Sequence, residues 1–419
     1  MNESAAVTNP RQQRVLARIH REVSAEFEAG RLQLQQRPDY HPVWAYFLDL
    51  LMRPLVPGML QEAVGRPLVE HLCNQAPFEL FHAMGVHPVR LGSGCFSVSR
   101  LSAGRFPVLM CPLLKATMGM LQLQAPSRTE ALPRVVPTTC DWVVKFPEMA
   151  DDPSSLTCFL ELPHLRQSEK GQIRWLEEMY DLVRFLEERT GRKLKRRALL
   201  SSVQTFMQAW DALGQLIELR RAGRLSGVWF MVAANSFMLD RIETWTEAVH
   251  RVVAVVSTQP PVSVGKGVFL AGSPIIFPNF KLPHLIEAAG MTLLGDDLCT
   301  SERMWPGAVC YEDPSLHGLM RALAERYHRA CSCPTFADNE RRINGILGFL
   351  QQHPVQGVIY HVLKGCHPFD IENFTLERQL KNRGYRFMKI ETDYVQEDCQ
   401  NILTRLEAFG QIDNGQTGI

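Results

Sequence analysis

Short apolar runs alternate with longer amphipathic segments along most of the chain from about residue 91 onward. This alternation is typical of βα units arranged around a parallel sheet. It predicts strands at "FPVLM" (106–110) and "RVVPT" (134–138), followed by long helices over 168–191 and 197–223 that each end at a glycine. A 3.6-residue spacing places apolar side chains on the buried faces of these helices: Ile173, Leu176, Tyr180 and Val183 on the first, and Leu199, Val203, Trp210 and Leu213 on the second.

The same rhythm resumes near residue 262 and continues to the end of the chain. Strands are predicted at "VFLAG", "MTLLGDD", "GVIYHVL" and "RFMKIETDY", and amphipathic helices separate them. Residues 1–90 show aromatic and leucine pairs but no strand pattern, so we expect a helical region there. The pattern therefore predicts an α/β protein with a helical region at 1–90, a first α/β domain with long helices at 91–260 and a second α/β domain at 261–419.

Composition narrows the function classes. The chain has 419 residues, of which 46% are hydrophobic and 21% charged, as expected of a globular protein. Its 45 basic residues nearly balance its 44 acidic residues, whereas a protein that binds nucleic acid or an anionic membrane carries a clear excess of Lys and Arg. The first twenty residues lack the apolar core of a signal peptide, and no apolar run is long enough to span a membrane. We therefore expect a cytoplasmic protein without nucleic-acid or membrane partners.

Cysteine is the residue type that indicates a possible metal or catalytic site. A cytoplasmic compartment keeps thiols reduced, so the eleven cysteines are better explained as metal ligands, catalytic groups or core residues than as disulfides. Four of them, Cys111, Cys140, Cys299 and Cys366, follow predicted strands, and ligands of open α/β sheets bind at that edge. Two sheets facing one another across a cleft would bring these thiols together around zinc or iron and sulfide. Because structural zinc usually takes closely spaced pairs, the long intervals favour a cluster assembled by the folded chain.

Four segments extend this interpretation to a family. "MCPLLKATMG", "VVPTTCDWVVKFPEM", "GVIYHVLKGCHPFDIE" and the closing "MKIETDYVQEDCQNILTRLEAFG" closely resemble the 2-hydroxyacyl-CoA dehydratase D-component family, which also contains benzoyl-CoA reductase subunits and double-cubane cluster proteins. The resemblance runs from about residue 90 to 411. It implies two flavodoxin-like (Rossmann-like) domains of parallel sheet with a metal cluster in the cleft between them. It also implies a 4Fe-4S cluster held by Cys111, Cys140 and Cys366, with one iron open to another ligand.

Two further segments, "DDLCTSER" and "ACSCPTFADNERR", resemble the double-cubane members of the family. The resemblance implies a second set of thiolates, formed by Cys299 with one or both of Cys331 and Cys333, and a double-cubane 8Fe-9S cluster in place of the single one. The alternative is that "CSC" packs beneath the helix that follows it. Both interpretations stay open, and the segments around Cys140 and Cys366 favour the single cluster.

The function implied by the resemblance is that of an iron-sulfur subunit, a lyase or oxidoreductase of anaerobic metabolism, that transfers single electrons at low potential to a CoA thioester. The reaction is either elimination of a 2-hydroxyl group or reduction of an aromatic ring. A separate ATP-dependent iron-sulfur activator protein supplies the electron, and a homologous second subunit or a homodimer completes the enzyme. "VGKGVF" lacks the spacing of a phosphate-binding P-loop, so we expect no ATP hydrolysis by this chain. His367, next to Cys366, is the candidate for proton transfer.

Two other functions remain open. A double-cubane homodimer would reduce small molecules. A site closed by four protein ligands would belong instead to a non-catalytic iron-sulfur or zinc protein that acts as an electron carrier or scaffold.

Overall fold

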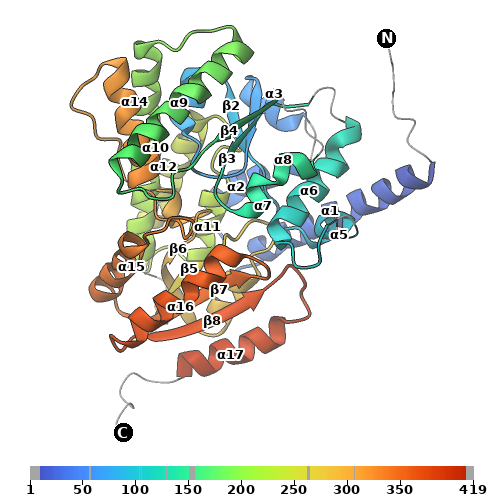
Figure 1. Cartoon of the computed structure of the whole chain (residues 1–419). Helices are drawn as coiled ribbons and strands as arrows, with labels where there is room; N and C mark the ends of the chain where they lie inside the picture. The colour runs from blue at the N-terminus through green and yellow to red at the C-terminus, as the bar shows by residue number, and fades with distance from the viewer. Residues whose placement is uncertain are drawn as a thin grey trace.

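The computed structural model describes residues 10–55, 58–102, 104, 106–127, 131–150, 156–261, 265–305 and 307–411. Within these ranges the chain forms two four-stranded parallel sheets surrounded by helices (Figure 1). The predicted α/β fold with parallel sheets is therefore confirmed. No helix in the described ranges is long and apolar enough to cross a membrane. Residues 1–9, where the sequence predicts no signal peptide, lie outside the described residues.

Both sheets have the same strand order. The first sheet is ordered β2-β1-β3-β4, and the second is ordered β6-β5-β7-β8. Each is thus a 2-1-3-4 sheet of the flavodoxin-like type, in which the chain reverses direction across the sheet between the first and third strands. The strands are β1 (Leu68–His71), β2 (His87–Arg90), β3 (Arg134–Pro137), β4 (Thr157–Leu160), β5 (Lys266–Gly272), β6 (Met291–Asp297), β7 (Val355–Leu363) and β8 (Arg386–Thr392).

Helices cover both sheets and join them. In Figure 1, α16 crosses in front of β7 and β8, and α17 lies at the opposite end of the molecule from α9 and α14. The helices are α1 (Pro10–Gln35), α2 (Ala45–Met52), α3 (Met59–Val64), α4 (Phe78–Ala83), α5 (Phe96–Ser102), α6 (Pro112–Gln124), α7 (Asp141–Val144), α8 (Phe146–Met149), α9 (Glu169–Thr190), α10 (Arg196–Arg221), α11 (Gly227–Asn235), α12 (Ile242–Thr258), α13 (Lys281–Ala288), α14 (Leu316–Ala324), α15 (Glu340–Gln352), α16 (His367–Lys381) and α17 (Cys399–Gln411).

The first sheet differs from the prediction at two places. Strands β1 and β2 lie within residues 1–90, where we expected helices alone. The strand β1 does not show an apolar run in the sequence because it contains Glu70. The buried carboxylate of Glu70 accepts a hydrogen bond from Arg134 of β3 at 2.5 Å. Residues 106–110 form no strand: Val108 is 88% exposed and Leu109 is 73% exposed in the loop that leads to α6.

The two long helices are confirmed, but the buried face of one is not where the spacing placed it. On α10 all four predicted residues are buried. On α9, Val183 is buried as predicted and Leu176 and Tyr180 are half-buried, but Ile173 is 55% exposed. The fully buried face is instead formed by Trp175, Met179 and Leu182. The bulky Trp175 sets the orientation of α9, since its indole ring stacks on His328, with 5.7 Å between the ring centroids.

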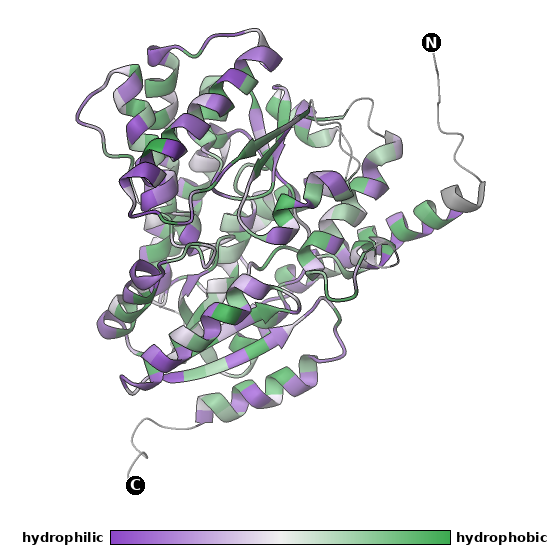
Figure 2. Ribbon diagram, viewed as in Figure 1, coloured by the Kyte–Doolittle hydropathy of each residue, from purple (hydrophilic) through white to green (hydrophobic). Residues whose placement is uncertain are grey.

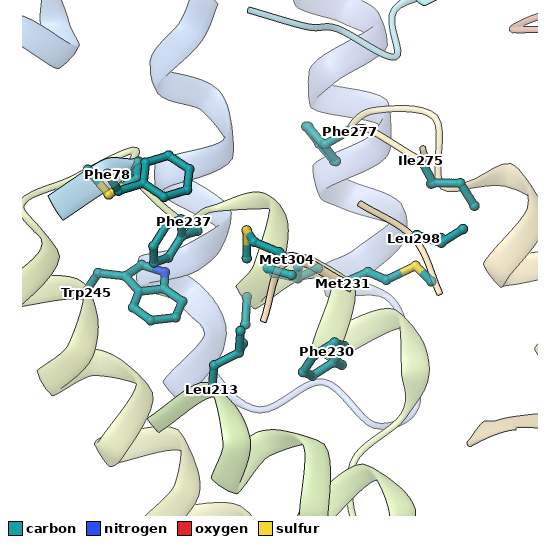
Figure 3. Close-up of a cluster of buried hydrophobic side chains, with 14 of the residues drawn as sticks. Phe78, Leu213, Phe230, Met231, Phe237, Trp245, Ile275, Phe277, Leu298 and Met304 are labelled. Carbon is teal, nitrogen blue, oxygen red and sulfur yellow. The ribbon is translucent and has the colours of Figure 1, made fainter. Parts of the chain in front are cut away.

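One continuous core connects the two sheets. Trp210 of α10 stacks on Phe237 at 4.9 Å between centroids, and Phe237 meets Trp245 of α12 edge to face. In Figure 3, Phe237 and Trp245 lie on one side of Met304, and Met231 of α11 lies on its other side, next to Leu298 of the second half of the chain. Figure 2 shows that the outer helices are amphipathic instead: hydrophilic and hydrophobic residues alternate along α17. The shared core fixes the carboxyl ends of the two sheets relative to one another.

Candidate metal centre

Three of the predicted site cysteines each stand immediately before a helix. Cys111 precedes α6, Cys140 lies between β3 and α7, and Cys366 lies between β7 and α16. Proline in the first turn of α6 and α16 presets the backbone for a helix start. Backbone N–H groups that open a helix are unpaired and favour a thiolate over a thiol. We call Cys111, Cys140 and Cys366 the first cysteine group.

The side chains of Cys111 and Cys366 form a hydrogen bond, although they come from segments that pack on different sheets. The Cys366 thiol lowers the pKa of Cys111, and the N–H groups of Leu113 and Leu114 lower it further against the opposing effect of burial. The same contact, followed by burial, raises the pKa of Cys366 well above its ordinary value. The lowered pKa makes Cys111 the more acidic thiol of the pair, and a metal that replaces the thiol protons would bind both sulfurs.

A glycine makes this contact possible. Gly365 has φ +74°, a backbone conformation that favours glycine, and a Cβ added there would lie 2.0 Å from the carbonyl oxygen of Leu109. The loop before Cys366 thus packs directly on the backbone that leads to Cys111. Only a residue without a side chain permits this approach.

Cys140 completes the first group and links it to other thiols. Burial raises the pKa of Cys140 to about 11, and the neighbouring Cys366 and Cys333 contribute in the same direction. Two buried polar atoms near the group have no hydrogen-bond partner among the described residues, the indole Nε1 of Trp142 and the hydroxyl of Tyr394. Burial and then Cys111 and Cys366 raise the pKa of Tyr394, so its hydroxyl stays a proton donor toward the thiols.

A second cysteine group adjoins the first. It consists of Cys299, which follows β6, Cys331 and Cys333 before α15, and Cys73, which follows β1. Burial raises the pKa of Cys331 to about 12, assisted by Cys333, and burial with Cys333 and Cys299 raises the pKa of Cys73. Since Cys333 also acts on Cys140, the two groups form one connected set of thiols in the interior.

Two arginines act on Cys299. Burial alone would raise its pKa, but the cations of Arg90 and Arg303 outweigh burial and lower it. The Nη2 atom of Arg90 lies 3.5 Å from the Cys299 sulfur. Cys331 is held differently, because Gln75 Nε2 donates to its sulfur at 2.9 Å.

The turn that carries Cys299 is fixed by a buried carboxylate. Asp296 accepts hydrogen bonds from the Ser301 hydroxyl at 2.7 Å and from the N–H groups of Leu298 and Glu302. Its charge is balanced by Arg220 of α10 at 2.6 Å, and neither side chain is exposed. Asp296 therefore positions the turn and is not itself a group facing the thiols.

The surroundings of the second group suit an anion. Arg166 donates to the carbonyl oxygen of Cys331, and Arg303 donates to that of Ser332 at 2.6 Å. Both guanidinium groups are buried, and each keeps N–H groups without a hydrogen-bond partner in the described part of the chain, although Arg303 Nε also lies 3.6 Å from the carboxylate of Asp297. The reduction potential of a thiolate-bound cluster depends on charge and on hydrogen bonds to its sulfurs. Buried donors of this kind therefore suit a bound cluster better than a core of apolar side chains alone.

The arrangement does not suit a single metal ion. Among the described residues, no three His, Cys, Asp or Glu side chains surround a common point as the ligands of one ion would. An iron-sulfur cluster takes its cysteines on different irons, so its thiolates need not converge on one point. Iron with sulfide and zinc are both among the metals that soft ligands such as thiolates select.

The remaining predicted residue, His367, is placed away from the thiol contacts. It is exposed at the first position of α16 and makes no hydrogen bond with another described residue. Its role in proton transfer stays a prediction.

Sequence reasoning missed several groups that the structure places at the centre. Cys73, Gln75 and Arg90 belong to β1, β2 and the loop between them, a range that we expected to be helical. The signal for Cys73 was its place after the short strand in "LVEHLC". Arg303 donates to the Ser332 carbonyl oxygen, and its charge acts on Cys299; both interactions depend on the tertiary fold.

The family comparison agrees with this geometry. A model of the family described as 2-hydroxyglutaryl-CoA dehydratase, D-component, matches residues 73–412, a range that contains both cysteine groups. The chain belongs to this family. The D-component match begins at Cys73, just after β1, and covers the other three strands of the first sheet and the whole of the second sheet.

Individual relatives of this D-component protein are distant but cover most of its length. The protein named "Putative dehydratase subunit YjiM" of Escherichia coli is 25% identical over 361 residues, which is 82% of this chain and 91% of the relative. The (R)-phenyllactyl-CoA dehydratase beta subunit of Clostridium sporogenes is 21% identical over 84% of this chain and 92% of the relative. The (R)-2-hydroxyglutaryl-CoA dehydratase subunit beta of Acidaminococcus fermentans is 21% identical over 84% and 93%, respectively.

Proposed function

We propose that this protein is the iron-sulfur component of an enzyme of the 2-hydroxyacyl-CoA dehydratase type, with a 4Fe-4S cluster held by Cys111, Cys140 and Cys366. The observation that carries the proposal is the contact between the Cys111 and Cys366 thiols, brought together from separate segments by Gly365. Dehydratase subunits among the relatives support the reaction class. The benzoyl-CoA reductase type would use the same ligands.

The protein residues have defined tasks in this proposal. When bound, the cluster supplies single electrons at low potential to a CoA thioester. Cys111 and Cys366 lose their thiol protons when they become ligands, and the Tyr394 hydroxyl and Trp142 Nε1 are buried donors without a described partner that can serve the sulfurs. Cys111 is buried, whereas Cys140 and Cys366 are half-buried, so part of the group is shielded from water.

We also propose that partner proteins approach the first group from the side of α16. Val108, Leu109, Ile371 and Phe374 are exposed apolar side chains next to Cys111 and Cys366 in the sequence, and each is at least 67% exposed. Exposed apolar clusters mark interaction sites. A homologous second subunit, as in the relatives named as beta subunits, or an ATP-dependent activator protein suits this surface.

A second candidate function rests on the second cysteine group. Cys299, Cys331 and Cys333, with Cys73, lie within reach of the first group through Cys333 and Cys140, beside the unpaired N–H groups of Arg166 and Arg303. If these thiols also bind iron, the cofactor is a double cubane and the chain is a homodimeric reductase of small molecules.

Iron content of a Cys299→Ala variant separates the two candidates. The single-cluster proposal predicts about four irons per chain in the wild type and in the variant. Loss of about half the iron on this one change would favour the double cubane. Iron is measured with acid-labile sulfide on anaerobically purified protein.

Gly365→Ala tests the approach of the two loops. The added Cβ would meet the Leu109 carbonyl, so the loops must separate and the variant should lose most of its iron. Gly384→Ala is the matched control, because Gly384 has φ +79° but nothing within 4 Å of the added Cβ. In both variants a non-glycine residue in the left-handed conformation lowers the free energy of unfolding by about 1–2 kcal/mol. Full iron retention in Gly365→Ala would contradict the proposed ligand pair.

A further inference from the structure

The thiols of the first cysteine group accept hydrogen bonds from donors of two kinds. Backbone N–H groups in the first turn of each following helix donate to the thiol before it, and each bond favours the thiolate over the thiol. These bonds run from Leu113 and Leu114 to Cys111, from Trp142 and Val143 to Cys140, and from Phe369 to Cys366. Unpaired N–H groups open every helix, so a property particular to this site must come from side chains.

A side chain of this kind is Ser273, which directly follows β5 and is fully buried. Its hydroxyl forms a hydrogen bond with the Cys366 sulfur that favours the thiolate. A hydroxyl has this effect when it donates its hydrogen to the sulfur. The Ser273 oxygen is an acceptor at the same time, because the N–H group of Leu363 donates to it at 3.0 Å. The hydrogen of Ser273 is therefore left for Cys366.

The backbone of Ser273 is held on both sides by His361 of β7. The Ser273 N–H donates to the His361 carbonyl oxygen at 2.8 Å, and the imidazole Nδ1 donates to the Ser273 carbonyl oxygen at 3.1 Å. Nδ1 carries the proton in this contact because a carbonyl oxygen only accepts. The other ring nitrogen, Nε2, meets the Thr392 hydroxyl at 2.7 Å. Burial lowers the pKa of His361 to about 4, so the imidazole is neutral near pH 7 and holds Ser273 in one position.

Two backbone features bring the hydroxyl to the sulfur. Leu363, the last residue of β7, gives its N–H to Ser273 Oγ and accepts the N–H of Cys366 on its carbonyl oxygen at 2.9 Å. A single residue thus positions the donor relative to the acceptor. Gly272 allows β5 to pack closely on β7, since a Cβ added there would lie 2.0 Å from the carbonyl oxygen of His361. The Ser273 hydroxyl is therefore oriented by the fold before any metal binds.

A donor fixed in this way acts on a bound cluster through charge. Reduction adds an electron whose negative charge is shared with the cysteine sulfurs, and hydrogen bonds to an anionic acceptor are stronger than those to a neutral one. The bond from Ser273 to Cys366 therefore stabilises the reduced form more than the oxidised form. The effect is larger in a buried site, where water screens the charge less.

We propose that Ser273 is a positioning residue of the first cysteine group, whose hydroxyl holds the Cys366 sulfur and raises the reduction potential of the cluster bound there. The inference rests on the proposed function and deepens it, because it names a residue that adjusts the electron affinity of the site. Ser273 is not a metal ligand in this assignment: its hydrogen stays on the oxygen, and the oxygen accepts from Leu363.

Redox titration of the full chain, purified anaerobically and reconstituted with iron and sulfide, tests the assignment. Ser273→Ala removes the hydroxyl, and we expect it to keep the iron content of the wild type and to shift the midpoint potential to a more negative value. Ser102→Ala is the matched control. Ser102 is also fully buried, but its hydroxyl donates to the carbonyl oxygen of Lys115 in α6 at 2.7 Å, so its midpoint should equal that of the wild type. The midpoint is read from the electron paramagnetic resonance signal of the reduced cluster during stepwise reduction with titanium(III) citrate.

Ser273→Thr separates the hydroxyl from general packing. Threonine keeps the hydroxyl, so its midpoint should return toward that of the wild type, although its added methyl group disturbs the buried site more than alanine does. An unchanged midpoint in Ser273→Ala, or an equal shift in Ser102→Ala, would overturn the assignment. If Ser273→Ala holds no iron, Ser273→Thr decides: wild-type iron and midpoint support the role of the hydroxyl, whereas loss of iron there as well overturns it.

The outcome is separable from that of the proposed function. If the wild-type chain holds a cluster and the midpoint of Ser273→Ala is unchanged, the role of Ser273 fails and the iron-sulfur component stands. If the wild-type chain holds no iron after reconstitution, the proposed function fails and the role of Ser273 fails with it.

Discussion

Replacing Cys111 by alanine should remove the iron of the first group and its visible absorbance from anaerobically purified protein. Cys111 and Cys366 are in contact and are two of the three proposed ligands, so loss of either sulfur would leave only two thiolates to hold the proposed cluster. Cys140→Ala and Cys366→Ala should have the same effect. The measurement is the absorption spectrum together with iron per chain.

A matched cysteine that is not in either group controls this prediction. Cys399 begins α17, and its thiol donates to Gln396 at 3.3 Å rather than to another cysteine. Cys399→Ala should therefore keep the absorbance and the iron of the wild type. Retention of all iron in Cys111→Ala would remove that residue from the proposed ligand set.

The second large effect is on stability. Asp296→Ala removes the nearer of the two carboxylates of Arg220, whose guanidinium is fully buried, and leaves only Glu302, at 3.6 Å and shared with Arg221, to balance that charge. Breaking a buried ion pair in this way costs about 3–5 kcal/mol, so the free energy of unfolding in urea should fall by that amount. The turn that carries Cys299 loses its anchoring hydrogen bonds at the same time.

An exposed ion pair provides the contrast. Lys145 and Glu148 lie 2.8 Å apart, but both are largely exposed. Because solvent screens such pairs, Glu148→Ala should leave the urea midpoint unchanged. A similar midpoint for Asp296→Ala and Glu148→Ala would contradict the structural role given to Asp296.

The second sheet was predictable because its strands are long and apolar. Strands β5 and β7 have 7 and 9 residues, and nearly all of them are buried, so their pattern is visible without tertiary information. The first sheet was harder, since its strands have 4 residues each and carry buried polar groups such as Glu70 and Arg134. A carboxylate that is neutralised by a partner 64 positions away looks like a surface residue in the sequence.

The site was predictable in part, and the signal that located each cysteine differed. Cys140, Cys299 and Cys366 do follow strands, as the pattern predicted, whereas Cys111 follows an exposed loop. The start of α6 and the family motif, not a strand, locate Cys111. The contacts of Arg90, Gln75 and Arg166 with the second group join segments far apart in the chain, and no local pattern encodes such contacts.

The most direct test of the account is a joint measurement of iron, acid-labile sulfide and zinc in the anaerobically purified wild-type chain. The account predicts iron and sulfide in equal amounts, at least about four of each per chain, with zinc near zero. Stoichiometric zinc without sulfide, or a chain that binds neither metal after anaerobic reconstitution with iron and sulfide, would contradict the claim that these cysteines hold an iron-sulfur cluster.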